Sequence, residues 1–168
     1  MTFPTLPGAL LGGSFLGLAL LATAETPLPP PPSIPYGTPI GTEDAKRVAA
    51  AAIAEARRNN WNMAIAIVDG GGYLVYFERM PNTQLASVDL AIEKARTSAL
   101  FRRPTKVFQD VVAGGGDGLR VLRLTGAIPN EGGVPIVIEG KIVGAIGISG
   151  GSVEQDGQAA RAGAGSLK

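Results

Sequence analysis

The sequence contains neither cysteine nor histidine. Their absence excludes a thiolate nucleophile, a disulfide, the usual zinc site and a serine–histidine–aspartate relay. The charges nearly cancel, with 15 basic against 14 acidic side chains, and no block of Lys or Arg stands out. The sequence therefore lacks the electrostatic signature of a nucleic-acid-binding protein. Any chemistry has to use carboxylates, Arg, Lys, Tyr or the backbone.

The length predicts one domain, because 168 residues with 45% hydrophobic side chains suit a single core. Residues 1–24 carry no charged side chain and contain an apolar segment that ends in Ala22-Thr23-Ala24. Small residues at these positions fit the signal-peptidase pocket, so 1–24 is predicted to be a secretory signal peptide and the protein to be periplasmic or secreted. The alternative is a membrane anchor, but the apolar segment 9–24 is shorter than the ~20 residues that span a bilayer. After cleavage we expect no membrane association.

Residues 25–41 contain seven prolines. Proline cannot donate a backbone hydrogen bond and favours extended polyproline geometry, so this stretch is predicted to be a linker. A ligand for a proline-binding module is the alternative. The folded domain is expected at 42–168, with Thr42 as the N-cap of its first helix.

The domain's patterns predict the order helix, hairpin, two helices, hairpin, helix. The segments are a helix from Thr42 to about Arg58, strands 62–69 and 73–80, a helix 85–101, a short helix 106–113, an ambiguous stretch 119–124, strands 134–138 and 141–149, and a helix from Ser152. Ser152 and Gln155 have the spacing of a capping box. Two hairpins need no parallel crossover, so the fold class is α+β, with one antiparallel sheet of about five strands flanked by helices.

Three glycine-containing stretches are candidates for ligand-binding loops. The glycines at 70–72 fit a hairpin turn better than a dinucleotide loop, because they lack the required spacing before a helix. The loop 129–136 is either a tight connection into an edge strand or a site. The stretch 146–156, IGISGGSVEQD, is a strand-to-helix corner of the kind that binds anions, but Glu154 and Asp156 in its first turn oppose an incoming phosphate.

The charged side chains indicate a functional site less clearly than the glycine-containing stretches do. The candidate acids do not form a pair with catalytic spacing; they are Asp69, Glu78, Asp89, Glu93, Glu131, Glu154 and Asp156. A basic cluster of Arg96, Arg102, Arg103 and Lys106 could clamp a carboxylate or a propionate. Arg102 and Arg103 could equally complement the dipole at a helix C-terminus.

Four segments together carry a family resemblance. They are AIVDGGGYLVYFERM (66–80), SVDLAIEKARTSALF (87–101), RPTKVF (103–108) and EGGVPIVIEGKIVGAIGISGGSVEQD (131–156). Over residues 45–167 the chain resembles the GlcG/HbpS-like family (DUF336), also called the haem-degrading domain family. The resemblance implies a profilin-like α/β/α sandwich with a five-stranded antiparallel sheet, homo-oligomers, and haem or another small anionic molecule as the partner.

The resemblance also implies which positions line a ligand pocket formed by the glycine loops. They are Arg79, Met80, Glu93, Arg96, Glu131, Gly132, Gly133, Gly150, Gly151, Gln155 and Asp156. Some relatives coordinate the haem iron through histidine, which this chain lacks. The remaining axial candidates are Tyr73, Tyr76 and Met80, while Met63 is expected in the core.

Three functions follow as hypotheses. The favoured one is an exported protein that binds haem or a similar anion, with a role in haem or redox sensing and without turnover of its own. The second is an enzyme or accessory protein acting on a small hydroxy- or oxo-carboxylate, with Arg96 as clamp and Glu93 or Glu131 as base. The third is a structural oligomer whose site has decayed. No residue in the sequence by itself establishes catalysis.

Overall fold

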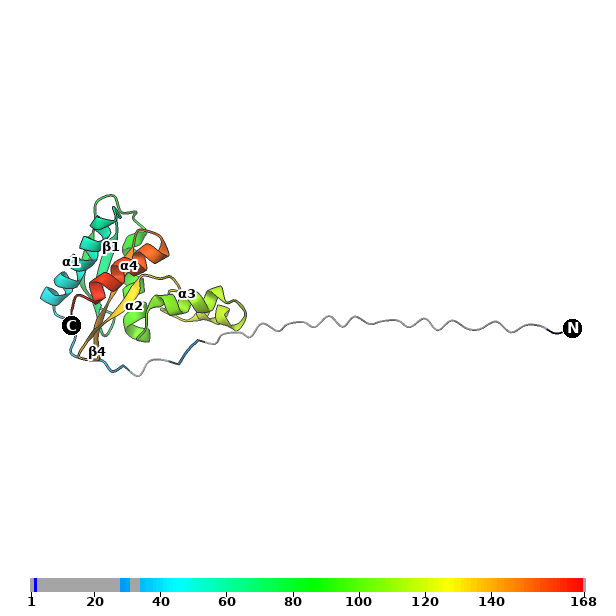
Figure 1. The fold of residues 1–168 in the computed structure, drawn as a ribbon. Coiled ribbons are helices and arrows are strands. Elements are labelled where there is room, and N and C mark those ends of the chain that lie inside the picture. The colour runs from blue at the N-terminus through cyan, green and yellow to red at the C-terminus, as the bar shows by residue number, and fades with distance from the viewer. Residues whose placement is uncertain (1, 3–27, 31–33, 168) are drawn as a thin grey trace.

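The fold is seen in a computed structural model that describes residues 2, 28–30 and 34–167 (Figure 1). The predicted signal peptide and the start of the linker lie outside the described residues, apart from residue 2. The elements are α1 (Thr42–Arg58), β1 (Ala64–Asp69), β2 (Leu74–Arg79), α2 (Ser87–Phe101), α3 (Thr105–Ala113), the 3₁₀ helix η1 (Gly116–Arg123), β3 (Gly133–Ile138), β4 (Lys141–Ser149) and α4 (Val153–Ala164). This order confirms the α+β class. The N-cap of α1 is Gly41, so Thr42 is the first helical residue and not the cap.

The sheet has four strands, in the order β2-β1-β4-β3, and each neighbouring pair is antiparallel. The expectation of five strands was wrong. The ambiguous stretch before the second hairpin belongs to η1, where Gly118 and Val121 are buried while Leu119 and Leu122 are exposed. Buried positions three residues apart suit a 3₁₀ helix, whereas a strand would bury alternate residues.

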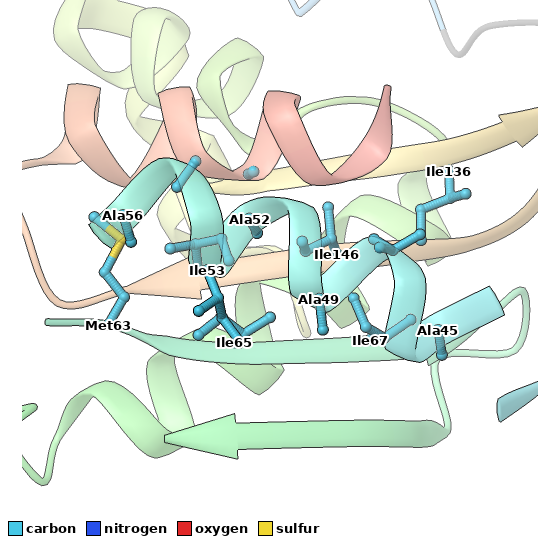
Figure 2. Close-up of a cluster of buried hydrophobic side chains, with 14 of the residues drawn as sticks. Ala45, Ala49, Ala52, Ile53, Ala56, Met63, Ile65, Ile67, Ile136 and Ile146 are labelled. Carbon is cyan, nitrogen blue, oxygen red and sulfur yellow. The ribbon is translucent and has the colours of Figure 1, made fainter. Parts of the chain in front are cut away.

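The helices form layers on both faces of the sheet: α1 and α4 cover one face and α2 covers the other (Figure 1). Because side chains alternate along a strand, β1 turns Ile65 and Ile67 toward α1 and turns Ala64, Ala66 and Val68 toward α2. Figure 2 shows the larger of these two clusters, in which alanines of α1 pack on isoleucines of the sheet. The α2 side is built from alanines, so this helix lies close to the strands.

Part of the Pro-rich stretch packs on the domain. Ile142 of β4 donates its N–H to Pro35 O at 2.9 Å, and Gly37 donates to Ile142 O at 2.8 Å. Ile40 is buried in the core on the α1 side. Residues 35–40 therefore run beside β4 before α1 begins. Among the described residues, no helix has the length and hydrophobicity needed to span a membrane.

Candidate ligand-binding groove

An open groove runs along the outer side of α2. Its walls are Glu93, Arg96 and Leu100 of the helix and Gly126, Ala127 and Ile128 of the segment before β3, and it encloses about 390 Å³. Positions 93, 96 and 100 lie three and four residues apart, which places them on one side of the helix. The groove thus combines a carboxylate, a guanidinium and an apolar wall.

Thr97 holds the two walls of the groove together. Its hydroxyl donates to Gly126 O at 2.9 Å and accepts the N–H of Ile128 at 3.1 Å. Thr97 itself is fully buried, whereas its partner Gly126 is exposed and its partner Ile128 is half-buried. One side chain therefore sets the position of the loop 126–128 against α2.

The two charged residues of the groove lie on the exposed face of α2. Among the residues that the structure describes, neither Glu93 nor Arg96 forms an ion pair within the domain. Leu100 beside them is 46% exposed. An unpaired guanidinium next to exposed apolar surface is suited to a ligand that has an anionic group on an apolar body.

Other predicted pocket residues surround a buried ion pair. Lys94 Nζ lies 2.7 Å from Asp156 Oδ2 and donates a second hydrogen bond to Ile148 O at 3.1 Å. Gly132 passes so close to the pair that a Cβ there would lie 2.5 Å from Ile148 O and 3.0 Å from Lys94 Nζ, and its φ of +127° also favours glycine. Gly132, Gly133 and Asp156 are buried, so this part of the motif packs the interior and lines no groove.

Glu131 is engaged on another side of the same loop. Its Oε1 accepts a hydrogen bond from Arg161 Nη1 at 2.6 Å, and its backbone N–H donates to Gln109 Oε1 at 2.8 Å. Gly157 faces this carboxylate, and a Cβ there would collide with Glu131 Oε1. The loop 129–136 is thus a packed connection that ties β3 to α3 and α4.

The backbone N–H groups at the start of α4 donate hydrogen bonds to side chains of the same segment. Gly151 donates its N–H to Asp156 Oδ1 at 2.9 Å, and Ser152 donates to Gln155 Oε1 at 2.9 Å. Ser152 accepts from the Gln155 N–H, which confirms the capping box. Burial raises the pKa of Asp156, while Lys94 and the N–H groups of the corner act in the opposite direction. The anion cradle considered for 146–156 is therefore filled by the chain's own acid and amide.

Gly150, Gly151 and Gln155 also border a shallow polar depression of about 300 Å³. The other lining residues are Asn60, Trp61, Asn62, Asn82 and Gln84. This depression shares no lining residue with the α2 groove. The structure therefore does not bring the expected pocket residues together in one place.

The residues proposed at the end of the first hairpin lie outside the groove. Arg79 is exposed at the end of β2, and Met80 is buried in the core on the α1 side. Tyr73 precedes β2 and is 74% exposed. Tyr76 lies on the α1 face, where its hydroxyl donates to Glu78 Oε2 at 2.8 Å and this bond raises the Tyr76 pKa.

Of the six residues that line the α2 groove, Glu93 and Arg96 were predicted from the sequence and the other four were not. Leu100 continues their helical spacing and could have been found from it. Gly126, Ala127 and Ile128 have no such signal, because long-range contacts place them beside α2, among them the hydrogen bonds of Thr97. Within the described part of the chain, no cluster of three or more acidic side chains could hold a metal ion.

The four-stranded sheet between helical layers, with a groove on the face covered by α2, defines a small α+β domain with a candidate ligand site. The sequence of residues 40–165 matches the family described as "Haem degrading protein HbpS-like", and the chain belongs to this family.

Individual relatives agree with this assignment. The chain is 41% identical to Protein GlcG of Escherichia coli (strain K12) over 105 residues, which cover 62% of this chain and 77% of GlcG. It is 33% identical to the corrinoid adenosyltransferase PduO of Salmonella typhimurium over 130 residues, or 75% of this chain and 39% of that protein.

Two solved structures share the fold. The crystal structure of HbpS is similar with a TM-score of 0.72 and 28% sequence identity, covering 81% of this chain and 95% of that chain. The crystal structure of a PduOC–haem complex is similar with a TM-score of 0.70 and 30% identity, covering 78% and 96% of the two chains.

Proposed function

We propose that this protein binds haem, or a similar flat anionic molecule, in the α2 groove and has no turnover of its own. The observation that carries the proposal is the position of Arg96 beside the apolar side chains of Leu100 and Ile128. Arg96 is suited to hold a propionate, and the apolar wall is suited to cover a ring edge. The haem complex of the PduOC relative supports haem as the ligand.

The groove fits the edge of haem better than it fits the iron. Its lining residues contain no imidazole, thiolate, phenolate or thioether. The carboxylate of Glu93 is the one side-chain group among them with an oxygen atom. Strong axial ligands in haem proteins are His, Cys, Met and Tyr. We therefore expect weak haem binding that depends on Arg96 and on the apolar wall.

The test is a titration of the purified protein with hemin, followed by its Soret absorbance. We expect a saturable shift at one haem per chain. Arg96→Gln should weaken binding by about tenfold or more, because a charge-assisted hydrogen bond contributes about 1.5–3 kcal/mol. Arg79→Gln is the matched control, since it removes an exposed guanidinium outside the groove.

Two results would contradict the haem proposal. One is a response equal to that of an unrelated protein. The other is equal loss of affinity in Arg96→Gln and Arg79→Gln. Tyr73→Phe, Tyr76→Phe and Met80→Leu extend the test to the axial candidates. These residues lie outside the groove, so a Soret change lost in one of them would contradict the α2 groove as the haem site.

A second function is favoured by the pairing of Glu93 with Arg96 in one groove. These residues suit a small hydroxy- or oxo-carboxylate, with Arg96 as the clamp and Glu93 as the base. Glu131 is less suited to act as the base, because Arg161 already holds its carboxylate. Calorimetric titration with lactate and pyruvate tests this function, and Glu93→Gln should abolish any turnover without abolishing binding.

We also propose that the protein is exported and forms homo-oligomers. The charge-free segment 1–24 with its Ala-Thr-Ala end supports export. The family resemblance supports oligomers. Sedimentation equilibrium of the purified protein tests the second point, and a monomer at all concentrations would refute it.

A further inference from the structure

Arg103, in the turn after α2, is a buried cation whose hydrogen-bond partners are backbone carbonyls. The residue is 5% exposed, and its guanidinium donates to Pro29 O at 2.8 Å and to Phe101 O at 3.2 Å. No carboxylate forms an ion pair with it in the described part of the chain. Since burying a charge is costly unless it is hydrogen-bonded, the carbonyl of Pro29 compensates a desolvated donor.

Arg102 and Tyr36 make the neighbouring contacts. Arg102 Nη1 donates to Ile34 O at 3.4 Å, and its guanidinium carbon lies 5.8 Å from the centre of the Tyr36 ring. The Tyr36 hydroxyl donates to Ala99 O at 2.9 Å, at the end of α2. The described parts of the Pro-rich stretch are thus joined to one turn of the domain by side-chain hydrogen bonds.

The surface beside this turn is apolar. Pro104 and Val107 of the α3 start and Pro135 and Val137 of β3 line it together with Pro29, Pro30 and Ile34. Leu28 packs against the cluster of Phe108, Val111 and Val121. Apolar side chains flanked by donors match a polyproline segment, which has no internal hydrogen bonds and leaves its carbonyls free to accept.

We propose that the surface formed by Arg102, Arg103, Pro104, Val107 and Pro135 is a recognition site for an extended proline-rich peptide, and that its occupant is this chain's own proline strap. The proline strap is defined here as residues 28–30 and 34–36. The Pro-rich stretch then serves as a docked element and not as a free tether. Cleavage at the proposed site after Ala24 leaves the strap on the mature chain.

The strap braces two residues of the α2 groove. The Tyr36 hydroxyl also donates to Leu100 O at 3.3 Å, and Leu28 and Ala127 pack against the same Phe108 cluster. Leu100 and Ala127 are on opposite walls of the groove. Docking of the strap therefore stabilises both walls, although the strap site does not depend on which ligand the groove holds.

The absence of cysteine allows a direct test in the full chain. Pro30→Cys gives a single attachment point for a nitroxide label on an exposed strap residue. The readout is the paramagnetic loss of methyl signal intensity at Val107 and Val137. Ile53, on the opposite face of the sheet, reports whether the fold is intact.

We expect the Val107 and Val137 signals to lose most of their intensity in the labelled chain. Arg103→Gln should restore them, whereas Arg123→Gln, which changes an exposed arginine of η1, should leave them broadened. Unchanged broadening in Arg103→Gln with intact Ile53 signals, or no broadening in the parent chain, would overturn the proposal.

A mixed sample tests whether the strap acts in cis. Isotope-labelled chains without nitroxide are combined with unlabelled chains that carry it. Signals that keep their intensity in this mixture support docking within one chain. Broadening in the mixture would show that the strap sits on a second copy, which would overturn the cis assignment.

Discussion

Lys94 Nζ and Asp156 Oδ2 lie 2.7 Å apart in the interior, where α2 meets the start of α4. Lys94 is 1% exposed, so its ammonium has no access to solvent. The pair joins two segments that are separated by 62 residues in the chain. It also explains why Gly132 is packed tightly, since a Cβ there would lie 3.0 Å from Lys94 Nζ.

Replacing one partner of this pair should be strongly destabilising. Lys94→Met leaves a buried carboxylate without its counter-charge, and such changes cost about 3–5 kcal/mol of the free energy of unfolding. Urea denaturation checks the value. Lys106→Met is the matched control, because its partner Asp110 is on the surface, and it should change stability little. Equal effects of the two substitutions would refute the role given to the buried pair.

Thr97→Val keeps the shape of the side chain, but it should weaken the attachment of the loop 126–128 to α2. The change removes the hydrogen bonds to Gly126 O and from Ile128 N–H, at a cost of about 0.5–1.5 kcal/mol for each bond, because Gly126 is exposed and Ile128 is half-buried. We expect faster hydrogen exchange at the Ile128 amide and weaker hemin binding.

Thr83→Val provides the comparison for Thr97→Val. Thr83 is also buried and donates a hydrogen bond to Met80 O at 2.9 Å, but it lies outside the groove. This variant should lose stability without losing hemin affinity. A parallel loss of affinity in both would mean that Thr97 acts only through global stability.

The pKa of Tyr76 should lie above the ordinary value for tyrosine. Its hydrogen bond to Glu78 is the main cause that raises its pKa above the ordinary value of about 10, because only the protonated hydroxyl can donate this bond. The folded protein then holds this proton more tightly than the unfolded chain. The corresponding stability is present below pH ~10 and is lost as the pH rises through the raised pKa.

Tyrosinate absorbance during an alkaline titration measures this effect. Tyr76→Phe should remove the highest-pH step, and Glu78→Gln should move that step to lower pH. The raised pKa also makes Tyr76 a poor source of a phenolate ligand for iron at neutral pH. A Tyr76 step at the position of an exposed tyrosine would contradict the assignment.

Export predicts a specific N-terminus. Expression of the full sequence in a secreting bacterial host should give a mature chain that begins at Glu25, because Ala22 and Ala24 form the small-residue cleavage pattern. Mass spectrometry of the exported protein measures the N-terminus. Ala24→Trp should block processing, and an unprocessed parent chain in the cytoplasm would refute the export proposal.

Local patterns in the sequence determined most of the secondary structure. The capping box at Ser152 and the strand ranges 62–69 and 141–149, which contain β1 and β4, are set by neighbouring residues, and each was predicted. The family motifs also predicted that Glu93 and Arg96 belong to a ligand site, which remains a prediction. The missing fifth strand shows where local patterns fail to predict secondary structure. The stretch 119–124 is compatible with a strand or with a 3₁₀ helix, and its packing decides between them.

Tertiary structure decided where the motif residues point. Lys94 lies directly beside Glu93 in the chain, yet the helical turn sends one side chain into the core and the other to the surface. The pairing of Asp156 with Lys94, of Glu131 with Arg161 and of Thr97 with the loop 126–128 depends on contacts across many intervening residues. Sequence alone supplied these side chains and their local geometry, whereas burial and long-range hydrogen bonds determined which of them are used for packing and which remain available to a ligand.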